Sequence, residues 1–329
     1  MRFRNHLHCL SRLEATILYK LNFRCKERSE GLEGRLLTAC KPQPTTQNLP
    51  FRKVLQTSFN REVTLRLIRL MEVTSLFDVS DKIALVSGGA RGIGAMITKG
   101  LIANGARVIV VSRKPAPDAF PDAADQPGSV EFITADLSRD DEGKRVAEAV
   151  QSKYQKLHIL VNNSGCNWGA PLEKYPYDAF EKVFRLNVFG VFSLIKYLIP
   201  ILEKSGSAAD PARIINIGSV NGVAVPHLET YAYSSSKAAL HMLTQTLASR
   251  LAPKHITVNA VLPGPFLTHM TAASFKKADN AFVKSVPMGR LGHENDMAGA
   301  ILYLTSKASN YVTGALIPVD GGSLVSSKL

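Results

Sequence analysis

The chain has 329 residues, 45% of them hydrophobic, and a formal net charge of +13 at pH 7. This length and apolar content suffice for one large domain or two small ones. The charge is uneven, because residues 1–70 hold 14 Lys and Arg against 5 Asp and Glu. The remainder is only mildly basic, which gives little reason to expect a nucleic-acid partner.

Cysteine and histidine spacings predict neither a disulfide framework nor a metal site. The cysteines form no CxxC pair, and the eight histidines show no HExxH spacing, so we expect a reducing compartment. The longest apolar run extends from Val188 to Leu202 and is interrupted by Lys196. It is too short for a membrane span and is better interpreted as a buried helix.

Residues 1–70 are predicted to be a basic N-terminal extension without clear periodicity. Three interpretations stay open: a mitochondrial transit segment, a disordered basic tail, or a gene-model artefact. The third interpretation arises because Met71 is a plausible native N-terminus. We expect a cytoplasmic protein, or a mitochondrial one if residues 1–70 are a transit segment.

From Lys82 onward, short β-branched runs alternate with longer helical patterns. The predicted strands are Ile83–Ser87, Arg107–Val111, Val130–Thr134, His158–Val161, Arg213–Ile217, Ile256–Val261 and Ala315–Val319. The helical patterns run to about Asn104 and then cover Glu142–Tyr154, Tyr177–Glu203 and Ser234–Leu251. Residues 71–329 are therefore predicted to form one α/β domain, a Rossmann-type doubly wound parallel sheet with helices on both faces.

A glycine-rich turn lies between the first predicted strand and the first helix. Gly88, Gly92 and Gly94 have the G-x-x-x-G-x-G spacing, with Arg91 and Ile93 between them. Such a turn lets the backbone approach a pyrophosphate at a helix N-terminus, where anions are favoured. In the first unit of a βαβ pattern it indicates a dinucleotide site.

The end of the second strand indicates which dinucleotide binds. NAD-preferring sites place a carboxylate here to hold the ribose 2′-hydroxyl, whereas this chain has Ser112, Arg113 and Lys114. A guanidinium can bind a 2′-phosphate in bidentate fashion, and Arg91 in the glycine turn could reach the same place. We therefore favour NADP over NAD; the alternative is that Arg113 and Lys114 only begin a solvated loop.

Tyr233 and Lys237 are spaced four residues apart at the start of a helical pattern, so they share one helical face. A nearby cation favours a phenolate and lowers the tyrosine pKa from about 10. The pair therefore predicts a general acid/base. Taken alone, the spacing is also typical of an ordinary amphipathic helix.

Seven motifs in one order resemble the short-chain dehydrogenase/reductase family from about Asp81 to Gly322. They are Gly88–Gly94, Ala135–Leu137, Asn162–Gly165, Leu186–Val188, Ile217–Ser219, Tyr233–Lys237 and Pro263-Gly264. The closer similarity is to the rhamnolipid-biosynthesis type of 3-oxoacyl-ACP reductase and its fungal relatives. It depends on Trp168–Ala170, Asn216–Val220, Ala232-Tyr233 and Pro287–Arg290.

The resemblance implies a role for each matching residue. The implied catalytic residues are Asn187, which would hold a water, Ser219, Tyr233 as the acid, and Lys237. The implied NADP contacts are Asp136 at the adenine, Leu137 beside it in sequence, and Asn163 over the ribose. Tyr233 and Lys237 would also contact the cofactor, with Lys237 bonding the nicotinamide ribose, and Pro263, Gly264, Phe266 and Thr268 would surround the nicotinamide. The segment of about 264–293 would cover the substrate.

The implied activity is NADPH-dependent reduction of a ketone, with a 3-oxoacyl thioester or polyketide-type substrate that can be carrier-bound. One alternative is a secondary-metabolite dehydrogenase acting on an aromatic or polyketide intermediate. An alternative of another class is an inactive NADP-binding scaffold or sensor. The resemblance also implies a homo-tetramer or homo-dimer.

Overall fold

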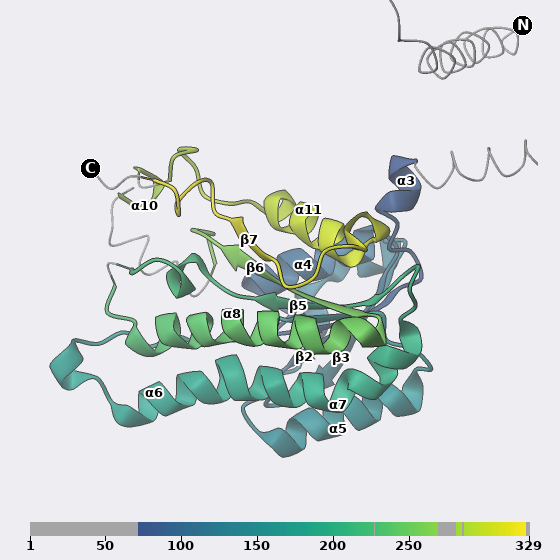
Figure 1. The fold of residues 1–329 in the computed structure, drawn as a ribbon, viewed down its shortest axis with the longest axis horizontal. Helices are drawn as coiled ribbons and strands as arrows, with labels where there is room; N and C mark the ends of the chain where they lie inside the picture. The colour runs from purple at the N-terminus through teal and green to yellow at the C-terminus, as the bar shows by residue number, and fades with distance from the viewer. Residues whose placement is uncertain (1–71, 227, 269–280, 285, 327–329) are drawn as a thin grey trace, which may run out of the picture. The chain divides into compact units, whose positions relative to one another are not determined.

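The computed structural model describes residues 72–226, 228–268, 281–284 and 286–326. Within them, seven parallel strands form one sheet in the order β3-β2-β1-β4-β5-β6-β7 (Figure 1). The strands are β1 (Ile83–Ser87), β2 (Arg107–Ser112), β3 (Ser129–Thr134), β4 (Ile159–Asn162), β5 (Ala212–Ile217), β6 (Ile256–Pro263) and β7 (Leu316–Val319). The predicted fold class is confirmed, and every predicted strand lies within two residues of an observed one.

Helices cover both faces of the sheet, because its central strands are apolar on both sides. One face packs against α5 (Asp140–Lys153), α7 (Gly190–Ser205) and α8 (Tyr231–Leu251). The other face packs against α4 (Gly92–Ala103) and α11 (Glu294–Thr305). Figure 1 shows these two layers on opposite sides of the strands.

The topological switch point of the sheet lies between β1 and β4, because β2 and β3 extend to one side of β1 and β4 to β7 extend to the other. Strand β1 pairs with both β2 and β4, and Ser87 is in register with Val111 on one side and Asn162 on the other. The loops that leave β1 and β4 therefore diverge at their carboxyl ends. In open α/β sheets this crevice is where ligands bind.

The long apolar segment predicted as a single helix is divided. α6 (Tyr177–Phe184) passes through a π-helical turn, η7 (Arg185–Phe189), into α7. By length and composition, Tyr177–Ser205 could cross a membrane, but 56% of its most apolar window is buried within the protein. α6 and α7 pack on α8 and α5, which is the behaviour of core helices.

A buried charged cluster closes the amino-terminal edge of the sheet. The guanidinium of Arg213, only 1% exposed, donates to Asp210, and Lys82 also pairs with that carboxylate. Burial alone would raise the pKa of Asp210, but hydrogen bonds from Lys82 and Arg213 leave it lowered. Nearby, His158 Nδ1 accepts the N–H of Ile83 at 3.0 Å.

This cluster makes stability sensitive to acid through His158. Burial and the neighbouring Lys82 lower its pKa from 6.5 to about 4. The folded state therefore binds fewer protons than the unfolded state between these values, and stability falls as the pH decreases through that window. His158→Asn keeps an acceptor near the Nδ1 position but cannot be protonated.

Between pH 6.5 and pH 5 the free energy of unfolding should decrease in the wild type. We expect this decrease to be roughly 1–2 kcal/mol smaller in His158→Asn. Urea unfolding at both pH values measures this difference, with His255→Asn, at an exposed histidine, as the matched control. An unchanged pH dependence in His158→Asn would show that another group causes the acid sensitivity.

Candidate active site

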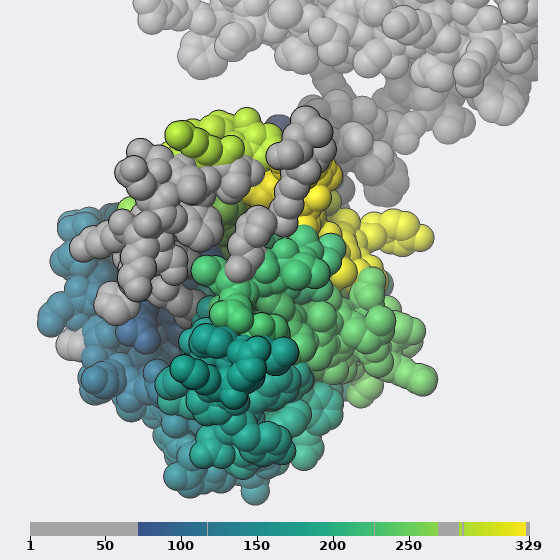
Figure 2. All heavy atoms as spheres, turned by 90° about the vertical axis from the view of Figure 1, so that its left-hand side faces the viewer, coloured from purple at the N-terminus to yellow at the C-terminus, as the bar shows by residue number. Residues whose placement is uncertain are grey.

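A cavity of about 1080 Å³ opens at the carboxyl ends of β1, β4, β5 and β6. Figure 2 faces this end, with blue atoms of the first βα units on the left and green atoms of the α8 region towards the right. Most of the predicted site residues line it: Gly88, Arg91, Gly92, Ile93, Ser112, Arg113, Lys114, Leu137, Asn163, Ser219, Tyr233, Lys237, Pro263, Gly264, Phe266 and Thr268. The structure thus brings residues from across 180 positions of sequence to one cavity. Gly94, Asp136 and Asn187 do not line it.

The glycine turn is fixed from the neighbouring strand by Asn163. Its side-chain amide donates to the carbonyls of Ser87 and Gly88 at 3.0 and 3.1 Å. Gly94 lies behind the turn, and a Cβ there would come within 2.1 Å of the Gly88 carbonyl oxygen. Its role in the structure is therefore close packing of α4 against the turn.

Three cations lie at the far end of the cavity. Arg91, Arg113 and Lys114 are exposed, and within the described part of the chain none has an ion-pair partner. Ser112 donates its hydroxyl to the Lys114 carbonyl at 2.7 Å, which holds this short loop in shape. This end of the cavity therefore has the charge needed to bind an anion.

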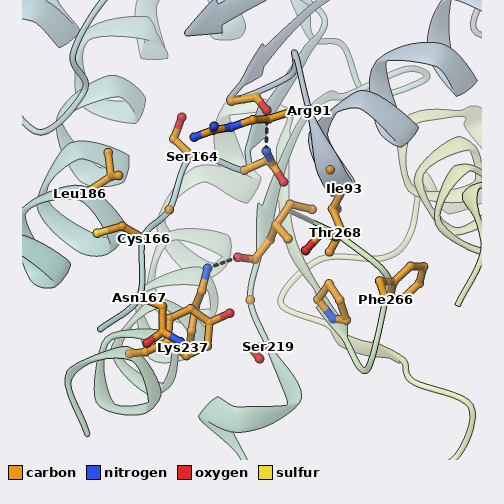
Figure 3. Close-up of a pocket in the computed structure, with 18 of the residues that line it drawn as sticks. Arg91, Ile93, Ser164, Cys166, Asn167, Leu186, Ser219, Lys237, Phe266 and Thr268 are labelled. Carbon is orange, nitrogen blue, oxygen red and sulfur yellow. Dashed lines mark hydrogen bonds between the residues drawn. The ribbon is translucent and has the colours of Figure 1, made fainter. Parts of the chain in front are cut away.

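The predicted acid and its neighbours converge at the other end. Lys237 Nζ donates to the Ile217 carbonyl at 2.6 Å and lies 5.6 Å from the centroid of the Tyr233 ring. A hydrogen bond links Ser219 to the Tyr233 phenol. Figure 3 shows Lys237 and Ser219 on one side of the cavity, with Phe266 and Thr268 on another.

The expected lowering of the Tyr233 pKa is wrong for this structure. Burial raises the pKa of the phenol, and the hydrogen bond with Ser219 offsets this only in part. Burial also lowers the pKa of Lys237 to about 8. Burial therefore decides the direction of the Tyr233 pKa, and the Lys237 ammonium donates to the Ile217 carbonyl.

Asn187 is fully buried behind the cavity wall, at the centre of the π-helical turn. Its Oδ1 accepts the N–H of Cys166 at 2.9 Å, and its Nδ2 donates to the Cys166 carbonyl and to Ser236 Oγ, both at 3.0 Å. These contacts fix the loop after β4 against α8. Its predicted role in holding a water stays a prediction.

Two predicted cofactor contacts have other partners in the structure. The Asp136 carboxylate accepts from the Ser138 N–H at 3.1 Å and from its hydroxyl at 2.8 Å. The side chain of Phe266 is 2% exposed and fills the space above Gly292, where a Cβ would come within 2.4 Å of the ring. Phe266 thus fixes the base of the predicted covering segment 264–293, of which residues 269–280 and 285 lie outside the described residues.

Sequence reasoning missed His241, which is buried one helical turn after Lys237. Its Nε2 accepts the backbone N–H of Ser219 at 3.4 Å. The available signal was the spacing of Tyr233, Lys237 and His241, which places all three on one face of a helix.

This fold and site define a Rossmann-type oxidoreductase. A family model described as enoyl-(acyl carrier protein) reductase matches residues 88–323. The chain is 46% identical over 251 residues to the rhamnolipids biosynthesis 3-oxoacyl-[acyl-carrier-protein] reductase of Pseudomonas aeruginosa, covering 75% of this chain and 97% of that protein. It is 34% identical over 246 residues to the 3-oxoacyl-[acyl-carrier-protein] reductase FabG of Thermotoga maritima, covering 74% and 98%.

A solved structure agrees with these matches. The Pseudomonas aeruginosa RhlG/NADP active-site complex aligns with a TM-score of 0.73 and 44% identity, over 76% of this chain and 99% of that one. The chain belongs to the short-chain dehydrogenase/reductase family, as its motifs predicted.

Proposed function

We propose that this protein is an NADPH-dependent carbonyl reductase that reduces a 3-oxoacyl thioester or a related polyketide-type ketone. The observation that carries the proposal is the convergence of Ser219, Tyr233 and Lys237 at one end of a cavity whose other end holds three cations. Relatives named as 3-oxoacyl-[acyl-carrier-protein] reductases support the substrate class. We propose more specifically that the thioester substrate is bound to an acyl carrier.

The cavity fits NADPH, whose nicotinamide supplies the hydride when bound. Arg91, Arg113 and Lys114 would hold the 2′-phosphate, and the glycine turn before α4 would hold the pyrophosphate. Pro263, Gly264 and the backbone of 266–268 would hold the nicotinamide end.

Three side chains of this chain would donate the proton to the substrate and stabilise the charges that form. The raised pKa of Tyr233 keeps its phenol protonated at neutral pH, which suits the acid that protonates the substrate oxygen. Ser219 would donate a hydrogen bond to the same oxygen and stabilise its developing charge. Lys237, which is largely protonated below pH 8, would stabilise the phenolate left behind.

Removing the phenol tests the assignment of the acid. We expect Tyr233→Phe to lower kcat by about 10²–10⁴-fold, because the proton donor is lost, while the Kd for NADPH stays near that of the wild type. Turnover is followed by loss of NADPH absorbance with a short 3-oxoacyl thioester, and binding by nicotinamide fluorescence. Tyr231→Phe, two residues away on α8, is the matched control.

The outcomes separate the rival functions. If the wild type binds NADPH but none of the ketones, thioesters or aromatic substrates tested causes its oxidation, the protein is the inactive scaffold or sensor. If only aromatic or polyketide ketones are reduced, the secondary-metabolite alternative holds. An active Tyr233→Phe variant would refute the assignment of the acid alone.

Removing the cations tests the cofactor preference. We expect the double change Arg113→Ala and Lys114→Ala to lower kcat/KM for NADPH by roughly 10–100-fold, because charge-assisted hydrogen bonds to the 2′-phosphate are lost. The value for NADH should change little. Lys144→Ala on α5 is the control for the removal of positive charge, and an equal loss with both cofactors would contradict the proposal.

We also propose that two or four copies assemble through the outer face of α6, η7, α7 and α8. Exposed apolar residues gather there: Tyr177, Phe180, Phe189, Phe192, Tyr231 and Met242. Figure 1 shows these helices as one layer. The small side chains of Ser235 and Ala238 are also exposed on α8, which would let a second copy approach closely.

We expect Phe192→Glu to lower the molar mass in solution, because a charge on this face opposes burial against a second copy. Light scattering after gel filtration measures the mass. Tyr311→Glu, which changes an exposed aromatic residue outside α6, η7, α7 and α8, should keep the wild-type mass. A monomeric wild type would refute the assembly.

The location stays the sequence-based proposal of a cytoplasmic enzyme. All three interpretations of residues 1–70 concern residues outside those that the structure describes.

A further inference from the structure

His241 lies directly beneath the segment that carries Ser219. It is 4% exposed and follows Lys237 by four residues, so both side chains leave the same face of α8. That face packs against the carboxyl end of β5, where Ser219 begins the short turn η8 (Val220–Gly222).

The His241 ring meets the backbone of this turn at both ends. Nε2 accepts the N–H of Ser219 at 3.4 Å. At the other end, an interaction with the Gly222 backbone favours the protonated ring; because Nε2 is an acceptor, the proton of the neutral ring lies on Nδ1, which we assign as the donor to Gly222. Burial, together with the charge of Lys237, lowers the imidazole pKa to about 4, which leaves the ring neutral, with one donor and one acceptor.

The turn is shaped to receive this ring. A Cβ at Gly218 would come within 2.3 Å of His241 Nε2, and a Cβ at Gly222 within 2.5 Å of its Cε1. Any larger residue at these two positions would push the turn away from α8. The imidazole therefore bridges the two ends of the segment 218–222 through one close contact at each end.

The 218–222 segment also sets the direction of the Ser219 hydroxyl. The serine is the N-cap of η8, and its Oγ accepts the N–H of Asn221 at 3.2 Å. The same hydroxyl bonds the Tyr233 phenol. A shift of the turn would move the hydroxyl away from the phenol. His241 would cause such a shift through the backbone of Ser219, to which it is bonded.

We propose that His241 is a positioning residue for the reduction, holding the 218–222 turn so that the Ser219 hydroxyl meets both the Tyr233 phenol and the substrate oxygen. Its neutral imidazole acts as a two-point clamp on the backbone and takes no part in proton transfer. The inference rests on the proposed reductase function.

Three substitutions separate the two bonds of the clamp. His241→Gln places an amide oxygen near Nε2 and keeps the acceptor for Ser219. His241→Asn places an amide nitrogen near Nδ1 and keeps only the donor to Gly222, and His241→Leu keeps neither. We expect kcat to fall about 10–100-fold in the Leu and Asn variants, to recover to within a few-fold in the Gln variant, and the Kd for NADPH to stay unchanged in all three.

A double-mutant cycle with Ser219→Ala distinguishes positioning from general damage. If His241 acts through the serine hydroxyl, His241→Leu should cause no further loss of kcat in the Ser219→Ala background. Additive losses, or equal kcat in the Gln, Asn and Leu variants, would overturn the inference. If the Leu variant does not fold, the comparison of Gln with Asn decides alone. An inactive wild type would instead refute the proposed function.

Discussion

Helix α8 is held against the end of β5 by polar side chains from three successive turns, and the geometry of the site depends on this seam. Lys237 donates to the Ile217 carbonyl, His241 accepts the Ser219 N–H, and the Thr244 hydroxyl accepts from the Asn216 amide at 2.9 Å. Each is a buried polar group that would destabilise the fold if left unpaired. The requirement to satisfy them therefore fixes the helix and strand in one register, and Tyr233 and Ser219 with them.

The strands and their parallel arrangement could be predicted because both follow from local patterns. Strands such as Ile83–Ser87 and β6 are mostly apolar and buried along nearly their whole length, and the glycine turn marks the first βα junction. These signals lie within a few residues of sequence. They also place Gly88 and Tyr233 at the same edge of the sheet, because parallel strands bring their carboxyl ends together.

What could not be predicted depends on contacts between distant residues. The π-helical turn at Arg185–Phe189 coincides with hydrogen bonds that Asn187 donates to the Cys166 carbonyl and to Ser236, which no helical periodicity reveals. The direction of the Tyr233 pKa depends on the burial of the phenol, which spacing on a helix does not specify. His241 was missed for the same reason, because its partners are backbone groups of another segment.

The π-helical turn also makes this part of the chain sensitive to length. A π turn contains one more residue than the α turn it replaces. Deleting a single residue here would allow regular α-helical bonding and would leave the following side chains on their faces, so Leu194 and Ile195, both 1% exposed, would stay in the core. The deletion would instead remove the local widening from which Asn187 reaches the Cys166 backbone and Ser236. The extra residue therefore serves the position of one side chain rather than the course of the helix.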